Sequence, residues 1–143
     1  MTSDLDAFLC EYETNHGIDK TYRCCQRFML TYLSLSAATL PEVAKDGLSI
    51  FGRFDAGLGT PAELESARVR CWEYLELRSE STQLDTPSTC AIRAAICLLY
   101  PSASNCDDLY ELVSWFLTLA NRVEDHTDQL DSLLMQSFNT SSP

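Results

Sequence analysis

The chain has 143 residues, of which 45% are apolar and 22% charged, and its 21 acids outnumber its 10 bases to give a net charge of −11. This length and apolar content can supply the core of one domain, so we expect a single domain over residues 1–138 and a frayed tail at 139–143. The negative charge disfavours DNA, RNA and anionic lipid as partners and favours a basic protein, although the same charge could serve only to keep the chain soluble.

The N-terminal residues predict two helices. The first should begin at Ser3, whose hydroxyl can cap it, and continue to about Asn15 before Gly17 ends it. Asp19 then caps a second helix, which is rich in apolar side chains: Tyr22, Cys25, Phe28, Met29, Tyr32, Leu33 and Leu35. So many apolar residues on one helix indicate that its later half is enclosed nearly all round, so we expect it at the centre of the core.

A helical hairpin is predicted next. Its first helix begins at Pro41 and extends to Phe54, and the segment 57–63 reads Gly-Leu-Gly-Thr-Pro-Ala-Glu. Glycine suits the left-handed end of one helix, Thr60 caps the next, and Glu63 completes a capping box. The buried stripe of this fourth helix should be Leu64, Ala67, Cys71, Trp72 and Leu75.

A fifth helix follows the polar stretch 79–85, which is the best loop candidate in the sequence. Thr86 and Pro87 start it, and residues 90–100 are almost entirely apolar, which is typical of a core helix. Arg93 is the only charged residue there, and a guanidinium on an apolar helix needs a partner. We expect either an internal ion pair or a pocket arginine that holds an anionic ligand.

The last third predicts one long acidic helix, capped by Ser104 or Asn105. Its apolar seam alternates in steps of four and three: Leu109, Val113, Phe116, Ala120, Val123, Thr127, Leu130 and Leu134. Trp115, like Trp72, should face a helix seam in the core. With no alternating strand pattern, the chain is expected to be all-α, a single-domain bundle of about six helices with antiparallel neighbours.

Cysteine usage indicates a reduced, cytoplasmic protein. Five of the seven cysteines lie inside apolar helical patterns, where a thiol behaves as a small hydrophobe: Cys24, Cys25, Cys71, Cys90 and Cys97. No pair has Cys-x-x-Cys spacing, which argues against structural zinc, and Cys106 is the most exposed candidate. The N-terminus has neither a basic nor an apolar signal region, and no segment has the length of a membrane span, so secretion and membrane insertion are disfavoured.

No recognisable catalytic motif is present, so we expect a non-catalytic protein with no cofactor. His16 should be a cation at the C-terminal end of the first helix, where the helix dipole favours it. His126 lies among Glu124, Asp125 and Asp128, and these side chains could bind a divalent metal or simply form a solvated helix face. Both interpretations of His126 stay open at this point.

Residues 51–72 carry a local resemblance to a known class of proteins. The stretch Phe-Gly-Arg-Phe-Asp-Ala-Gly-Leu-Gly-Thr-Pro-Ala-Glu-Leu over residues 51–64, followed by Ala67, Arg68 and Trp72, resembles a pattern in small bacterial helical proteins, including immunity proteins of polymorphic and contact-delivered toxins. The resemblance implies a cytosolic protein that neutralises a cognate toxin by covering its active site. Acidic charge fits this role, since nuclease toxins commonly present basic substrate clefts.

The leading hypothesis is therefore a non-catalytic inhibitor whose carboxylates occupy a basic cleft on a partner protein. The expected partner-binding residues are Glu124, Asp125, Asp128 and Asp131, followed by Asp107, Asp108 and Glu111. One alternative is a metal-assisted hydrolase in a helical bundle, with His126 and carboxylates as ligands. Another is a self-associating scaffold, such as a homodimer, that uses the apolar seam of the last helix for oligomer contacts.

Overall fold

The structure is a computed structural model that describes residues 2–77, 86–103 and 108–139. The described residues form helices and no strand, so the all-α prediction is confirmed. In chain order the helices are α1 (Thr2–His16), α2 (Ile18–Ser34), the short 3-10 helix η1 (Ala37–Thr39), α3 (Glu42–Asp55), α4 (Pro61–Leu77), α5 (Pro87–Cys97), α6 (Leu109–Val123), the 3-10 helix η3 (Thr127–Gln129) and α7 (Leu130–Asn139).

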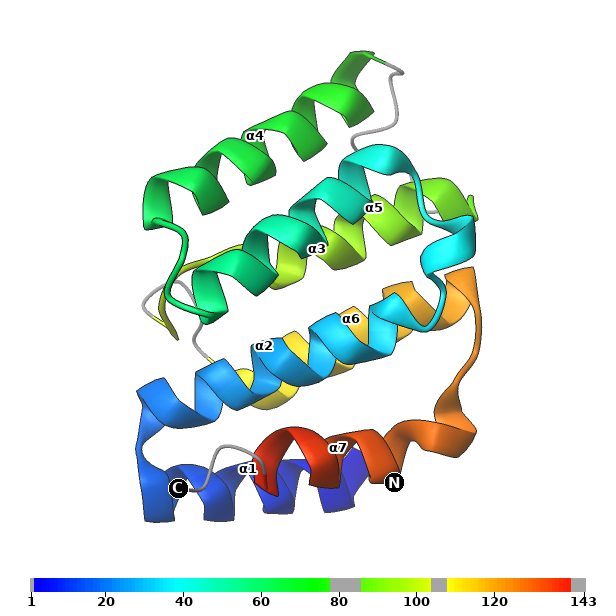
Figure 1. The fold of residues 1–143 in the computed structure, drawn as a ribbon. Coiled ribbons are helices and arrows are strands. Elements are labelled where there is room, and N and C mark those ends of the chain that lie inside the picture. The colour runs from blue at the N-terminus through cyan, green and yellow to red at the C-terminus, as the bar shows by residue number, and fades with distance from the viewer. Residues whose placement is uncertain (1, 78–85, 104–107, 140–143) are drawn as a thin grey trace.

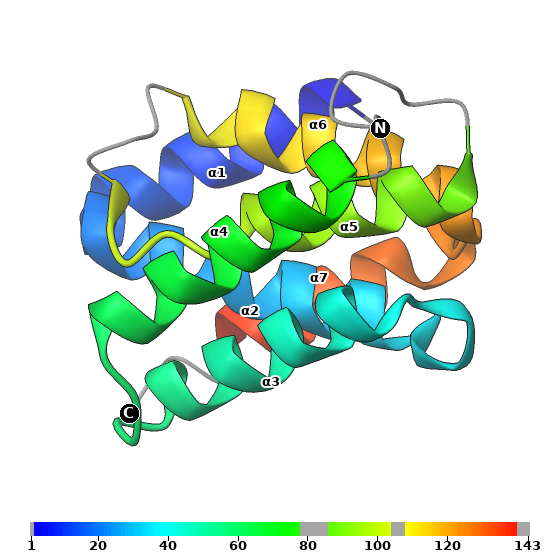
Figure 2. The same cartoon turned by 90° about the horizontal axis from the view of Figure 1, so that it is seen from above.

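Successive α-helices run antiparallel, as predicted, and stack along one direction of the molecule (Figure 1). α1 and α7 lie side by side at one end, α4 lies at the other end, and the pairs α2 with α6 and α3 with α5 lie between them (Figures 1 and 2). None of the helices in the described part of the chain combines the length and apolar character needed to cross a bilayer.

The core is built around α2 and α5, as their apolar composition predicts. In α5 every residue from Thr89 to Cys97 is buried except the half-buried Arg93. The largest fully buried side chains include Phe28 and Tyr32 of α2, with Phe51 of α3 and Phe116 of α6 packed into the same cluster. Each such side chain contributes about 1.5–3 kcal/mol by leaving water, so this cluster is the main source of stability.

The predicted helix boundaries at residues 57–63 are confirmed. Gly57 has a φ of +82°, the left-handed conformation that favours glycine after a helix end. The Thr60 Oγ1 accepts a hydrogen bond from the Glu63 amide at 3.3 Å, and the Glu63 Oε1 accepts one from the Thr60 amide at 3.0 Å. The capping box therefore fixes where α4 begins.

The single long C-terminal helix is a wrong prediction. α6 ends at Val123, Glu124 has extended backbone angles, and α7 turns back to pack against α2, which makes seven α-helices in the described residues where about six were expected. The periodicity misled because both helices bury stripes that continue one numerical pattern: Leu109, Val113, Phe116 and Ala120 in α6, and Leu130 and Leu134 in α7. These seam residues are buried inside the chain itself.

Several helix ends also differ from the prediction. Asp108 caps α6, accepting hydrogen bonds from the amides of Tyr110 and Glu111, and the predicted caps at 104 and 105 lie outside the described residues. Gly17, with a φ of +90°, occupies the N-cap position of α2, so Asp19 already lies within the helix. A short carboxylate can cap from any of several nearby positions, which sequence spacing does not separate.

Thr60→Ala should lower the free energy of unfolding by about 1 kcal/mol, because the amide of Glu63 loses its acceptor at the start of α4. Urea unfolding followed by circular dichroism measures the change. The control is Glu65→Ala, at an exposed site one turn into the same helix, which should change stability by less than about 0.5 kcal/mol. Equal effects of the two substitutions would contradict the role of the capping box.

The buried thiols should be chemically silent in the folded protein. Burial raises the pKa of Cys71 from about 9 to about 11 and that of Cys97 to about 12, so both stay protonated near neutral pH. Iodoacetamide at about pH 8.5 should label the exposed Cys10 and spare Cys71 and Cys97 until urea is added, as peptide mass mapping would show. Equal labelling of Cys71 and Cys10 without urea would contradict this.

The same two thiols make stability depend on alkaline pH. Their pKa values are raised in the folded protein, so their neutral form is favoured there and the unfolded chain ionises first as pH rises above about 9. The free energy of unfolding should therefore fall as the pH rises from about 9 towards the folded-state pKa values. Cys71→Ala should reduce this pH dependence.

Candidate functional site

The predicted partner-binding carboxylates form two groups in the structure. Glu124, Asp125, Asp128 and Asp131 lie in the α6–α7 connection and the first turn of α7, and we call the stretch from Glu124 to Asp131 the acidic connection. Asp108 and Glu111 lie at the other end of α6, whose 15 residues span about 22 Å. Asp107 lies outside the described residues. All six described carboxylate residues are exposed.

Three of these carboxylates also have a role in folding. Asp108 caps α6, and Asp125 accepts hydrogen bonds from both the amide and the hydroxyl of Thr127, which lower the pKa of its carboxyl group. The Glu124 Oε1 lies 3.2 Å from the Ser36 Oγ, which donates to it, and 3.4 Å from the His126 Nε2. Part of the acidic charge is therefore explained by local structure.

Asp128 and Asp131 have a weaker structural explanation. They lie in the first turns of η3 and α7, where a helix dipole favours a carboxylate by about 0.3–1 kcal/mol. Both residues are exposed, as is Gln129 between them. These two carboxylates are therefore the members of the acidic connection that are most available to a partner.

A buried tyrosine anchors the acidic connection to the core. Tyr32 of α2 is 1% exposed, and its hydroxyl donates to the Asn121 Oδ1 near the end of α6 and accepts from the His126 amide at 3.1 Å. Burial raises the pKa of Tyr32, which keeps the hydroxyl protonated and able to donate. The His126 Nε2 in turn lies 3.0 Å from the Ser36 Oγ just after α2.

A cleft of about 290 Å³ lies beside this anchor. We call it the α6 cleft, because five of its lining residues come from α6; it is lined by Leu5, Tyr32, Tyr110, Ser114, Leu117, Thr118, Asn121, Thr127 and Leu130. None of these nine residues is charged. The Ser114 Oγ is buried without a hydrogen-bond partner among the described residues. Burying a polar atom without a partner costs about 1–3 kcal/mol of folding free energy.

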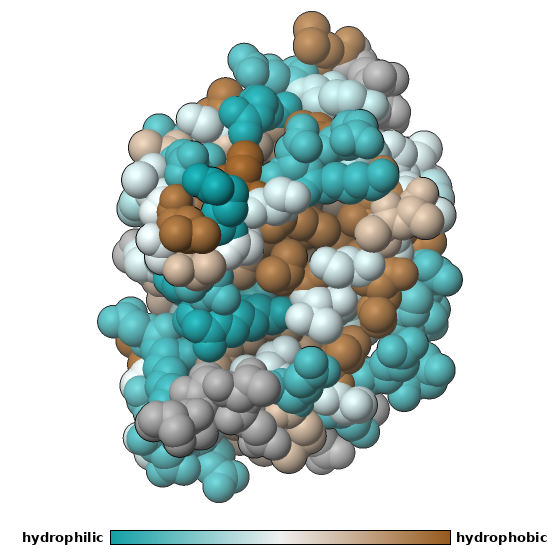
Figure 3. Space-filling model, in the orientation of Figure 1, coloured by the Kyte–Doolittle hydropathy of each residue, from teal (hydrophilic) through white to brown (hydrophobic). Residues whose placement is uncertain are grey.

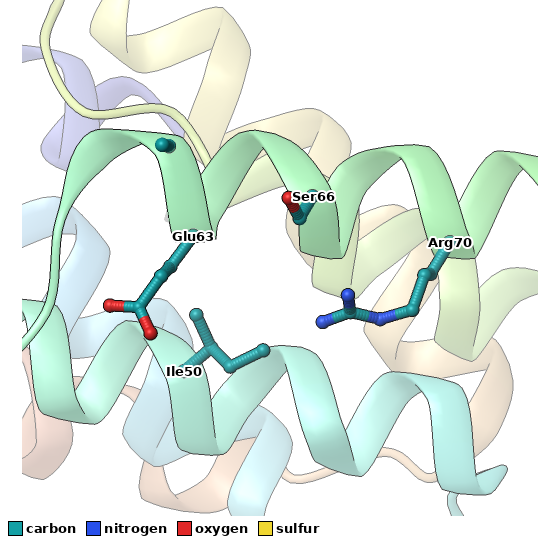
Figure 4. Close-up of a pocket in the computed structure, with 5 residues that line it drawn as sticks. Ile50, Glu63, Ser66 and Arg70 are labelled. Atoms are coloured by element: carbon teal, nitrogen blue, oxygen red, sulfur yellow. The ribbon is translucent and has the colours of Figure 1, made fainter.

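A second hollow, of about 280 Å³, lies between α3 and α4. Ile50 lies beneath it, with the carboxylate of Glu63 at one end and the guanidinium of Arg70 at the other (Figure 4). Ala62 and Ser66 complete its lining. The Glu63 carboxylate already belongs to the capping box, and Arg70 and Ser66 are exposed, so this hollow offers less enclosure and fewer unused polar groups than the α6 cleft.

Apolar surface is also visible between α2 and α3, bordered by polar side chains (Figure 3). α1 and α6 lie on the side away from the viewer in Figure 1 and at the top of Figure 2, so this face is not the one that carries most of the α6 cleft. Scattered apolar surface is normal on a folded protein, and nothing on the face converges on one point. The α6 cleft and its acidic neighbours remain the stronger candidate.

The histidines and Arg93 have identifiable surroundings. His16 ends α1, as predicted, with its ring stacked on Tyr12 and its Nδ1 3.1 Å from the Tyr12 carbonyl oxygen. Arg93 places its guanidinium 5.0 Å from the centre of the Trp72 ring, a cation–π contact that neither of its predicted roles included. Trp115 is 41% exposed, so its predicted burial in the helix seam is wrong.

The described residues do not provide a set of ligands for the metal site that the sequence suggested around His126. Within residues 2–77, 86–103 and 108–139, no group of three or more histidine, cysteine or acidic side chains is placed to hold a metal ion. His126 is 12% exposed at its side chain and contacts Glu124 and Ser36, so the predicted solvated helix face is wrong for this residue. It is instead part of the anchor between the acidic connection and α2.

Sequence reasoning missed the α6 cleft. The signal was present: Ser114, Thr118 and Asn121 recur at spacings of four and three and form a polar stripe beside the apolar seam. The bend after Val123 is what brings Thr127 and Leu130 back to close the cleft.

Comparisons of the chain with protein-family models, with curated proteins and with solved structures gave no match.

Tyr32→Phe should lower the free energy of unfolding by about 1–3 kcal/mol, because the His126 amide and the Asn121 carbonyl each lose a partner in a buried place. Chemical denaturation measures this, and in hydrogen-exchange experiments the substitution should accelerate exchange of the His126 amide more than exchange of the Cys90 amide in α5. The matched control is Tyr110→Phe at a half-buried ring, with an expected change below about 0.5 kcal/mol. An unchanged His126 exchange rate would refute the anchor.

Proposed function

We propose that this protein is a cytoplasmic, bacterial, non-catalytic inhibitor of the immunity type, which binds a basic toxin or effector protein and covers its active site. The observation that carries the proposal is the exposure of Asp128 and Asp131 beside the α6 cleft, on a connection that the Tyr32 anchor holds in place. An acidic segment that is hydrogen-bonded to the core beside a concave site is suited to a partner with a positively charged surface.

The charge of the acidic connection supports fast association. Four carboxylates lie within residues 124–131, and the neighbouring base is Arg122 at the end of α6. Exposed charges of one sign steer a partner of opposite sign during encounter and raise the association rate, with a strong dependence on salt. The proposal therefore assigns these carboxylates mainly to the speed and specificity of binding.

The exposed side of α6 can supply contact area to the same partner. Glu111 and Trp115 are one helical turn apart and both are exposed, Trp115 by 41%. Tryptophan is among the residues that contribute most at protein interfaces. A standard interface covers about 800 Å² on each partner, which corresponds to a patch roughly 30 Å across. One partner could therefore cover both ends of α6.

The double substitution Asp128→Lys with Asp131→Lys tests this surface. The intact chain, carrying an affinity tag, is used to capture binding proteins from the source organism, and the captured partner is then purified. The substitution should slow association with that partner at least about tenfold, measured by surface plasmon resonance, because it removes electrostatic attraction. Raising the salt concentration should slow association of the native chain more than that of the variant.

The control is Glu65→Lys with Glu73→Lys, which changes the net charge by the same amount at exposed sites on α4. α4 lies at the opposite end of the molecule from α7 (Figure 1). This control should keep the native association rate to within a few-fold. Equal loss in both variants would mean that only net charge matters, and unchanged binding in the first variant, with a native melting curve, would overturn the proposed interface.

A further inference from the structure

The α6 cleft presents mainly hydrogen-bond acceptors. The Tyr32 hydroxyl donates to Asn121, the Thr118 hydroxyl donates to the Ser114 carbonyl oxygen at 3.0 Å, and the Thr127 hydroxyl donates to Asp125. A threonine hydroxyl has one hydrogen and two lone pairs, so Thr118 and Thr127 donate their hydrogens within the chain and keep acceptor capacity, whereas the Tyr32 oxygen already accepts from the His126 amide. The side-chain NH2 of Asn121 adds a donor to this acceptor-rich lining.

Ser114 supplies an unused polar group in the same cleft. Its Oγ is buried and has no hydrogen-bond partner in the described structure, although most buried polar atoms in folded proteins have one. The residue lies in the middle of the lining part of α6, between Tyr110 and Thr118. This oxygen has less than 1 Å² of accessible surface, so a ligand N–H group that displaces the atoms covering it would give it the partner that the chain does not provide.

The charge around the cleft favours a cation. The lining itself is uncharged, and three exposed acids each follow a lining residue in the chain: Glu111 after Tyr110, Asp128 after Thr127 and Asp131 after Leu130. Asp125 reaches the lining directly through its hydrogen bond with Thr127. Arg122, which follows Asn121, is the base in this neighbourhood, so the acids outnumber it.

The size and apolar wall of the cleft fit a side chain better than a large cofactor. Its volume of about 290 Å³ lies just below the range of small-molecule sites, about 300–1,000 Å³. Leu5, Leu117 and Leu130 give it an apolar wall that can pack against methylene groups. Tyr110, which is half-buried, adds an aromatic ring, on which a guanidinium stacks more favourably than an ammonium.

We propose that the α6 cleft is a receptor for an arginine side chain of the partner protein. The guanidinium has five donors in a plane, which suits several separated acceptors, and it would donate to the Ser114 Oγ and the neighbouring hydroxyl oxygens while its methylene stem packs on the leucines. This inference rests on the proposed function, because the arginine would come from the basic protein that the acidic connection attracts.

The test is a nuclear magnetic resonance titration of the intact, isotope-labelled chain with n-butylguanidinium chloride at constant ionic strength. The probe should shift the backbone resonances of Ser114, Thr118, Asn121 and Thr127 saturably, with a dissociation constant in the millimolar range. Neutral n-butylurea, which has a similar shape, should bind at least about tenfold more weakly, because it lacks the charge that the acidic neighbours favour. Pentanoate should leave these resonances unchanged.

Thr118→Leu should abolish the shifts caused by n-butylguanidinium, because the larger side chain at this exposed lining position fills the mouth of the cleft. The matched control is Thr14→Leu on α1, an exposed threonine whose hydroxyl makes the same kind of bond to a carbonyl oxygen four residues earlier. The control variant should bind the probe as the native chain does. Both variants should keep the native melting temperature to within a few degrees.

Equal binding of n-butylurea, binding of pentanoate, or shifts that avoid the cleft residues would each overturn the arginine receptor. The outcome is separable from that of the charge-reversal experiment. If Asp128→Lys with Asp131→Lys slows partner binding and n-butylguanidinium does not reach the cleft, the interface stands and the arginine receptor falls. If the probe binds the cleft and charge reversal changes nothing, the cleft is supported as a cation site and the proposed interface falls.

Discussion

The buried hydroxyl of Tyr32 ties together α2, which carries it, the end of α6 through Asn121, and the backbone of the acidic connection through His126. A hydroxyl enclosed in apolar surroundings needs hydrogen bonds within the chain, because leaving it without a partner costs free energy. The partners of the Tyr32 hydroxyl, Asn121 and the His126 amide, lie on either side of the point where α6 ends. Glu124 is extended at this point, and the chain returns as α7 to pack against α2. The position of the acidic connection therefore depends on a residue about ninety positions earlier in the sequence.

Both parts of the candidate site follow from this bend. If α6 continued as one helix, Thr127 and Leu130 would extend away from the bundle, and the polar stripe of Ser114, Thr118 and Asn121 would face solvent. Because the chain bends, those two residues close one side of the α6 cleft, and each is followed in the chain by an exposed carboxylate, Asp128 or Asp131. A cleft and a charged edge that share one anchor would respond together to any change that loosens it.

Sequence reasoning predicted the parts of the fold that depend on neighbouring residues. The capping box of Thr60 and Glu63, the cap of Thr86 on α5 and the burial of α5 all follow from short-range chemistry, and the structure confirms them. The bend after Val123 could not be predicted this way, since no glycine or proline marks it and the apolar spacing continues across it. The residues around the bend make hydrogen bonds with Tyr32, which only the folded chain brings near. The α6 cleft was missed for the same reason.

The acidic residues differ in how much each contributes to the folded structure. Asp108 and Asp125 hold a helix start and a turn, and Glu124 contacts Ser36 and His126, so reversing any of these charges would also disturb local structure. A carboxylate engaged in this way exerts the same long-range field on a partner, but substitution cannot separate its two roles. Asp128 and Asp131 are stabilised mainly by helix dipoles, which are weak and screened by salt. Substitutions at these two positions therefore test the contribution of negative charge to binding with the least effect on folding.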